Sequence, residues 1–252
     1  MAKVLVGRLS VGRPFRTFLK ALAAGGAAVS ISGAANAALV YDTSLASPGF
    51  YNGTGNPNEG FTVNTQGGIE LGLGVNNRFI GPVHPTSTNQ YDVAIGFSTV
   101  PLAKWNFEYS VNVAGAGITL GQIHTLLTIT NLANLQSLSF DPFLVPDNAH
   151  FDGTTTFNGG GALTTDVGFQ NSENLSFFPF SPAFGWDPNA NGRYLITLAL
   201  VNESGGTIFS VDEQINATPI PAALPLFAGG AGVIGFFARR RKKEKKAAVA
   251  AA

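Results

Sequence analysis

In one short stretch of this 252-residue chain, oxygen-bearing side chains at alternate positions are followed directly by a glycine. Asp187, Asn189 and Asn191 are followed by Gly192, which fits the opening of a calcium loop, where oxygen ligands alternate and a glycine makes the turn. The twelfth position of such a loop would be Leu198, where calcium loops carry a bidentate glutamate. The stretch therefore predicts either a weak Ca²⁺ site or, the favoured interpretation, an ordinary polar turn before a strand.

The other titratable side chains do not form a known catalytic motif. A second acidic loop contains Asp141, Asp147 and Asp152, and the histidines are His84, His124 and His150. No Gly-x-Ser-x-Gly elbow and no His-Glu-x-x-His helix accompanies them. His124 lies among leucines and isoleucines, the setting of a structural histidine. Paired carboxylates for glycoside hydrolysis would come from separate strands, which a sequence does not reveal. We expect a protein that is not an enzyme.

An aromatic run could serve binding instead of catalysis. It begins with Phe177, Phe178, Pro179 and Phe180 and continues to Phe184 and Trp186. Exposed, such a run would form a face for a sugar or a protein partner; buried, it would be part of the core, which explains most clusters of this kind. Core packing is the favoured interpretation.

The formal net charge of zero hides a strong asymmetry along the chain. Five of the fifteen Lys and Arg residues lie in residues 1–20 and seven in residues 239–246, which leaves Arg78, Lys104 and Arg193 between them. Fourteen of the fifteen acidic residues lie in residues 38–217, so that region carries three positive against fourteen negative charges, a net −11. This sign argues against nucleic acid as a partner. The absence of cysteine excludes disulfides, thiolate metal sites and cysteine nucleophiles.

The elements that must position these residues are predicted to be strands. Trp105–Val113 alternates large apolar with polar residues, the period of a half-buried strand. Gln122–Thr130 and Arg193–Val201 are further strands, the second buried on both faces near its middle. Weaker candidates are Leu39–Asp42, Phe61–Thr65, Ile69–Gly74, Gln90–Ser98, Ser137–Phe140, Leu163–Phe169 and Thr207–Asp212. Short strands separated by Gly, Asn and Pro turns predict an all-β fold, a single antiparallel β-sandwich over residues 38–216.

Residues 1–37 have the three parts of a secretory signal peptide. A basic leader is followed by the apolar run Ala21–Ser32, which is short for a membrane span. Ala35 and Ala37 supply the small residues that signal peptidase needs, which places the cut before Ala38. The alternative is an uncleaved amphipathic anchor.

The C-terminal residues have the order of a membrane stop. The segment 217–221, which contains Pro219 and Pro221, is expected to form a stiff linker. The uncharged run Ala222–Ala238 follows it. Seventeen helical residues cover roughly 25 Å, the short end of a transmembrane helix. The cationic cluster 239–246 stays on the cytoplasmic side of such a span, and an Ala-rich tail, 247–252, completes the chain. The alternative is an ordinary single-pass anchor that is never cut.

These C-terminal features resemble the PEP-CTERM sorting signal of Gram-negative bacteria, also described as the ice-binding protein C-terminal domain. The resemblance rests on Pro219, Pro221, the apolar run and the cluster Arg239, Arg240 and Arg241. Ile220 stands where a glutamate is common between the prolines. The resemblance covers residues 217–246 and implies transient anchoring in the inner membrane, cleavage near the Pro motif by an exosortase, and association with extracellular polysaccharide.

Together the two ends predict an exported protein of the cell surface or extracellular matrix. It would be held at the inner membrane before release, would lack a cofactor apart from weak Ca²⁺, and would not be an enzyme. The alternative is a secreted carbohydrate-binding module or, less favoured, a carbohydrate-active enzyme.

Overall fold

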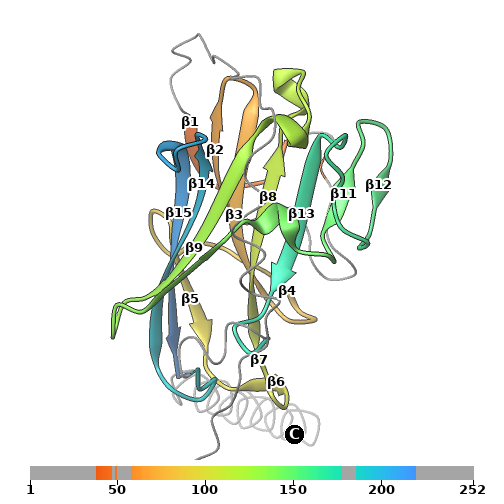
Figure 1. Ribbon diagram of the computed structural model, residues 1–252. Coiled ribbons are helices and arrows are strands. Elements are labelled where there is room, and N and C mark those ends of the chain that lie inside the picture. Colours follow the sequence, from red (N-terminus) through yellow and green to blue (C-terminus); the bar gives the residue numbers. More distant parts are fainter. Residues whose placement is uncertain (1–37, 47–48, 50–57, 178–185, 220–252) are drawn as a thin grey trace, which may run out of the picture. The chain divides into compact units, whose positions relative to one another are not determined.

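The computed structural model describes residues 38–46, 49, 58–177 and 186–219, and this part is built almost entirely of β-strands (Figure 1). The larger sheet, sheet A, has the order β1 (Ala38–Thr43), β2 (Phe61–Gln66), β3 (Ile69–Asn77), β8 (Trp105–Asn112), β13 (Gly168–Glu173), β11 (Ala149–Phe151) and β12 (Thr156–Phe157), with β4 (Gly81–Val83) also paired to β3. Sheet B has the order β10 (Ser137–Phe140), β9 (His124–Asn131), β14 (Gly192–Val201), β15 (Thr207–Thr218) and β5 (Gln90–Ala94). The expected all-β class is confirmed.

The remaining elements are short. β6 (Phe97–Thr99) pairs with β7 (Leu102–Ala103), and 3₁₀ turns are formed by η1 (Ala114–Ala116), η2 (Leu120–Gln122) and η3 (Pro142–Leu144). None of the described residues forms a helix that is long and apolar enough to cross a membrane. The predicted span 222–238 lies outside these residues.

The strands pair antiparallel, with one exception in sheet B. β5 runs parallel to β15, from Gln90 opposite Gln214 to Ala94 opposite Thr218. The sequence analysis predicted only antiparallel pairing, because β5 and β15 are remote in the chain and nothing local links them. As a result, the last strand lies inside sheet B, between β14 and β5.

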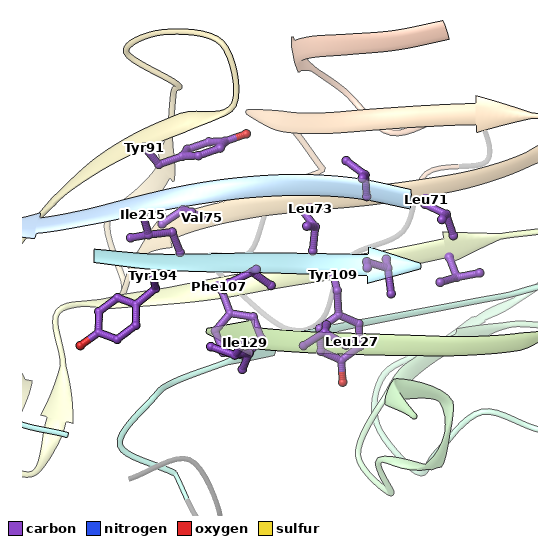
Figure 2. Packing of buried hydrophobic residues seen from close by; sticks show 14 of the residues in the cluster. Leu71, Leu73, Val75, Tyr91, Phe107, Tyr109, Leu127, Ile129, Tyr194 and Ile215 are labelled. Atoms are coloured by element: carbon purple, nitrogen blue, oxygen red, sulfur yellow. The ribbon is translucent and has the colours of Figure 1, made fainter. Parts of the chain in front are cut away.

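The two sheets pack their apolar faces against each other. Figure 2 shows Phe107 and Tyr109 of β8 close to Leu127 and Ile129 of β9. At one end, the rings of Trp105 in sheet A and Tyr194 in sheet B have centroids 6.0 Å apart. The five apolar positions of the Trp105–Val113 strand all belong to this core, as their alternation predicted: Trp105, Phe107, Tyr109, Val111 and Val113.

The opposite face of β8 is also buried, which corrects the expected half-buried strand. Its polar residues Asn106, Glu108, Ser110 and Asn112 are nearly inaccessible to solvent. Ala46 and Asn58, which lie at the two ends of the connection from β1 to β2, contact this outer face of sheet A. Ala46 N donates to both oxygens of Glu70, at 3.0 and 3.2 Å, and Asn58 Oδ1 accepts from Gln170 Nε2 at 2.7 Å.

Several predicted strands have wrong boundaries, among them Gln90–Ser98, which divides into β5 and β6, and Ile69–Gly74, which continues to Asn77. Gln122 belongs to η2, and β9 begins at His124. The candidate Leu163–Phe169 is mostly loop, and β13 begins at Gly168. β15 continues to Thr218, beyond the predicted Asp212 and two residues into the expected linker. The alternation there was hidden because Glu213 occupies an inward position between Val211 and Ile215.

Candidate functional site

The predicted calcium stretch forms a closed polar turn. Asp187 Oδ1 accepts from the backbone N of Asn189 at 2.9 Å, and Ala190 N donates to the Asp187 carbonyl at 3.0 Å. β14 begins directly afterwards at Gly192. Within the described part of the chain, no three His, Cys, Asp or Glu side chains are grouped to hold a metal ion. Ca²⁺ binding by Asp187, Asn189 and Asn191 stays a prediction.

The acidic residues of the second loop do not gather at one site, and Asp141 and Asp152 each make separate local contacts. Asp141 caps η3, since its Oδ1 accepts from Phe143 N at 3.0 Å and from Thr125 Oγ1 at 2.8 Å, and burial raises the pKa of this carboxyl. Asp152 closes a turn after β11, where hydrogen bonds from the backbone N of Thr155 and Thr154 lower its pKa.

The third acid of that loop, Asp147, forms a pair of carboxyl groups with Glu173 of β13, and Asn171 links the two. Asn171 Nδ2 donates to Asp147 Oδ1 and to Glu173 Oε1, at 3.0 Å each. Asn171 and Glu173 lie two residues apart on β13 and therefore share one face, with Tyr109 of β8 directly opposite Asn171. The loop after η3 brings Asp147 to them, and Asn148 holds that loop by donating to the carbonyls of Pro142 and Val145, at 2.9 Å each.

The two carboxyl groups of this pair differ in environment. Asp147 is exposed, whereas Glu173 is only 8% exposed, and its burial together with the nearby Asp147 raises its pKa to about 8. A carboxyl group with a raised pKa beside a second carboxyl group is the combination used in general acid catalysis of glycoside hydrolysis. The same arrangement also ties the η3 loop to β13, a structural role that the burial of Glu173 favours.

Sequence reasoning singled out Asp147 but missed Asn171 and Glu173. No local pattern could have found them, because the pair joins a loop and a strand that are 24 residues apart at the Asp147–Asn171 contact.

Two further carboxyl groups are buried in the fold. Burial raises the pKa of Glu108, on the outer face of sheet A, to about 8, although Asn76 Nδ2 donates to its Oε1 at 2.8 Å. Glu213 of β15 points into the core, and neither of its oxygens has a hydrogen-bond partner among the described residues. Burial, with a contribution from Glu108, raises the pKa of Glu213 well above its usual range. These raised pKa values favour the protonated form of both carboxyl groups in the folded protein.

Each of two histidines lies beside an aspartate. His150 Nδ1 is 2.8 Å from Asp166 Oδ2 in a buried contact, whose angles fall outside hydrogen-bond geometry, and its ring stacks on Phe157 with centroids 4.9 Å apart. His84 Nδ1 lies 2.5 Å from Asp42 Oδ1 in an exposed contact. In the described part of the chain, no serine or threonine hydroxyl is hydrogen bonded to either ring, so neither pair forms a triad.

The described ends of the aromatic run, Phe177 and Trp186, pack against the main core. Trp186 Nε1 donates to Ser176 Oγ at 2.9 Å, and its ring meets Trp105 edge-on with centroids 5.8 Å apart. These contacts favour core packing for the two residues. Phe178, Pro179, Phe180 and Phe184 lie outside the described residues.

The predicted processing residues flank the described strands. Ala38 is the first residue of β1, and Pro219 directly follows β15. The other predicted signal and sorting residues lie outside the described part: Ala35, Ala37, Pro221, Arg239, Arg240 and Arg241. Comparison with known protein-family models and with curated proteins finds no match to this chain.

Proposed function

We propose that this chain is an exported, non-enzymatic protein of the cell surface or extracellular matrix. In this proposal, residues 38–218 form a β-sandwich domain, preceded by a signal peptide and followed by a PEP-CTERM-like sorting signal with a transmembrane helix. The supporting observation is the position of the first and last strands. Ala38, the residue that signal peptidase would leave first, pairs with Thr65 of β2, and β15 ends one residue before the Pro motif.

The last residues of β15 explain why processing would have to occur beyond Thr218. Ala217 is buried and lies opposite Val93, and the Thr218 carbonyl accepts from Ile95 N at 3.0 Å. A cut within this strand would remove part of sheet B. A cut at the Pro motif, together with a signal cut before Ala38, leaves every described strand intact.

After release, such a domain must be stable without covalent cross-links. The chain has no cysteine, and the two described sheets bury a continuous apolar core between them. The strongly acidic composition favours solubility and opposes non-specific binding to anionic polymers. Association with matrix polysaccharide, carried over from the family resemblance, would therefore use neutral sugar contacts or a bridging divalent ion.

A second candidate, a carbohydrate-active enzyme, rests on the Asp147–Glu173 pair alone. Its test is hydrolysis of neutral polysaccharides by the wild-type protein and by Glu173→Gln. Hydrolysis that is lost in the variant would replace the non-enzymatic proposal.

Intact-mass analysis of the extracellular form tests both ends of the chain at once. We expect a single species that begins at Ala38 and ends close to Pro221. A species that retains residues 1–37, or one released with the cationic cluster 239–246 still attached, would contradict the proposal.

A further inference from the structure

One end of the two sheets contains the turns that lie closest to the end of β15. We call this region the tip: the β3–β4 turn with Arg78, the segment 95–104, the β9–β10 turn, and Arg193 at the start of β14. Figure 1 shows β6, β7 and the end of β15 at this end. The backbone connects them: Ile95 N donates to Thr218 O at 3.0 Å, Lys104 N to Gly96 O at 3.1 Å, and Arg78 N to Lys104 O at 2.8 Å.

The β9–β10 turn belongs to the same end through Arg193. Leu132 N donates to the Arg193 carbonyl at 2.8 Å, and Arg193 lies opposite Asn216 in the β14–β15 pairing, two residues before Thr218. The β9–β10 turn is therefore connected, through Arg193, to the end of the β14–β15 pair.

The tip carries the most exposed apolar side chains of the described residues. Those that are at least 75% exposed are Phe79 at 76%, Ile80 at 84%, Val100 at 75% and Leu135 at 75%. All four lie in tip turns, although they come from three separate connections. Large apolar groups gathered at one end of a soluble domain mark a surface for a partner or a membrane.

The tip also carries every cationic side chain of residues 38–219: Arg78, Lys104 and Arg193. The Arg78 guanidinium lies 5.0 Å from the centre of the Phe79 ring, next to the apolar group. The acidic side chains beside the tip are Asp187 and Asp92, and the latter accepts a hydrogen bond from Asn216 at 2.8 Å.

We infer that the tip docks on the surface of an anionic lipid bilayer. Apolar side chains flanked by arginine and lysine match the membrane interface, where the former enter the headgroup layer and the latter meet lipid phosphates. The inference rests on the proposed function, in which a span begins at Ala222. Four residue steps separate Thr218 from Ala222, so even an extended linker would place the start of the span within about 14 Å of Thr218, the last residue of β15.

The absence of cysteine allows a direct test on the full chain with single labelled positions. Thr99→Cys places an environment-sensitive fluorophore in the tip beside Val100. Ser204→Cys places it in the β14–β15 turn, at the other end of the ten-residue strand β14, about 30 Å away. Both residues are exposed. The labelled proteins are mixed with anionic vesicles of phosphatidylglycerol and phosphatidylethanolamine, or with neutral vesicles of phosphatidylcholine. Both vesicle types contain a lipid with a nitroxide quencher on its headgroup. Flotation of the protein with the vesicles is measured in parallel.

On anionic vesicles we expect quenching of the residue-99 fluorophore and none at residue 204. Replacing Arg78, Lys104 and Arg193 with Gln should lower the docking constant about fivefold for each cation removed, and raising the salt concentration should act in the same direction. Phe79→Ser with Ile80→Ser should also reduce quenching. Ile208→Ser, a matched change of an exposed apolar residue near Ser204, should not.

The outcomes separate this inference from the proposed function. Flotation on both vesicle types with equal quenching at residues 99 and 204 would overturn docking but leave the anchor. Flotation on anionic vesicles alone, abolished by the Gln substitutions, would support docking and contradict the anchor. Failure to float on either vesicle type would contradict both.

Discussion

At the scale of single residues, the fold is marked by carboxyl groups that it keeps neutral. Glu108 and Glu173 have pKa values of about 8, and the pKa of Glu213 is raised well above its usual range, in each case mainly by burial. A buried carboxyl group that ionises without a partner costs far more than one that remains protonated. The stability of the domain must therefore depend on protons held by these side chains.

The first prediction is that stability falls as pH rises. Each of these acids has a folded-state pKa above its unfolded value, so the folded state binds more protons between these values. For Glu108 and Glu173, the contribution of the protonated side chain to stability is complete below about pH 4.5, the usual glutamate pKa. This contribution is lost as pH rises through about 8. We expect the free energy of unfolding, measured in urea, to fall by at least about 1 kcal/mol per pH unit between pH 5 and pH 8.

A matched pair of variants separates this effect from general charge repulsion. Glu108→Gln should flatten the pH dependence, whereas Glu203→Gln, in an exposed turn, should change it little. Stability that increases from pH 5 to pH 8 would show that these groups are ionised in the fold.

The second prediction concerns the largest side chain of the core. Trp105 is 1% exposed and contacts the rings of Trp186 and Tyr194. Trp105→Ala should cost on the order of 3–5 kcal/mol of unfolding free energy, because it removes a large buried ring and leaves a cavity. Trp186→Ala should cost less, because Trp186 is only partly buried. Equal, small losses in the urea midpoint would contradict the assigned core.

At the scale of elements, the outer face of sheet A leaves room for Leu45, which follows β1 in the chain. A Cβ at Gly72 would lie 2.7 Å from Leu45 Cδ2, closer than van der Waals contact allows. β3 therefore has glycine where the β1–β2 connection packs, and Phe61 and Val63 of β2 complete the apolar cluster with Leu45.

This packing gives the third prediction. Gly72→Ala should destabilise the domain by about 1–3 kcal/mol through overpacking against Leu45. The same substitution in a Leu45→Ala background should cost less, since the clash is gone, and the double-mutant cycle should show a coupling larger than about 0.5 kcal/mol. Additive effects in urea unfolding would mean that Leu45 does not lie over Gly72.

Local sequence pattern could predict individual strands but not what covers them. The alternation of Trp105–Val113 depends only on neighbouring residues, and it correctly identified the inward side chains. The cover over the outer face of sheet A depends on contacts that are remote in the chain, such as those of Ala46 with Glu70 and of Asn58 with Gln170. For the same reason, the sequence predicted neither the meeting of Asp147 with Glu173 nor the parallel pairing of β5 with β15.

At the scale of the whole molecule, charge is distributed unevenly. The fourteen carboxyl groups of residues 38–217 face three cations, and the cations gather at the tip. Ions that reduce repulsion among the remaining acids should therefore stabilise the domain, and Ca²⁺ should do so most where it also gains oxygen ligands.

The fourth prediction is a calcium-dependent melting temperature for the released protein. Ca²⁺ at about 10 mM on a site with a Kd of 10⁻⁴ M, at the tight end of extracellular modules, would add roughly 2.7 kcal/mol. The comparison is CaCl₂ against EDTA, with NaCl at matched ionic strength. Asp187→Asn should remove the shift if the site uses the turn before β14. An equal shift from NaCl would reduce the effect to screening, and no shift would exclude the site.

The position of β15 inside sheet B also sets the order in which the protein can be assembled. β14 cannot meet β5 until the strand between them has been delivered, and that strand is the last of the described domain. A chain exported from its N-terminus would therefore cross the membrane with sheet B unfinished, and would close it only when Thr218 emerges. Because the proposed span follows within four residues, completion of the fold and arrest of translocation would coincide, so the sorting enzyme would meet a domain that has just finished folding.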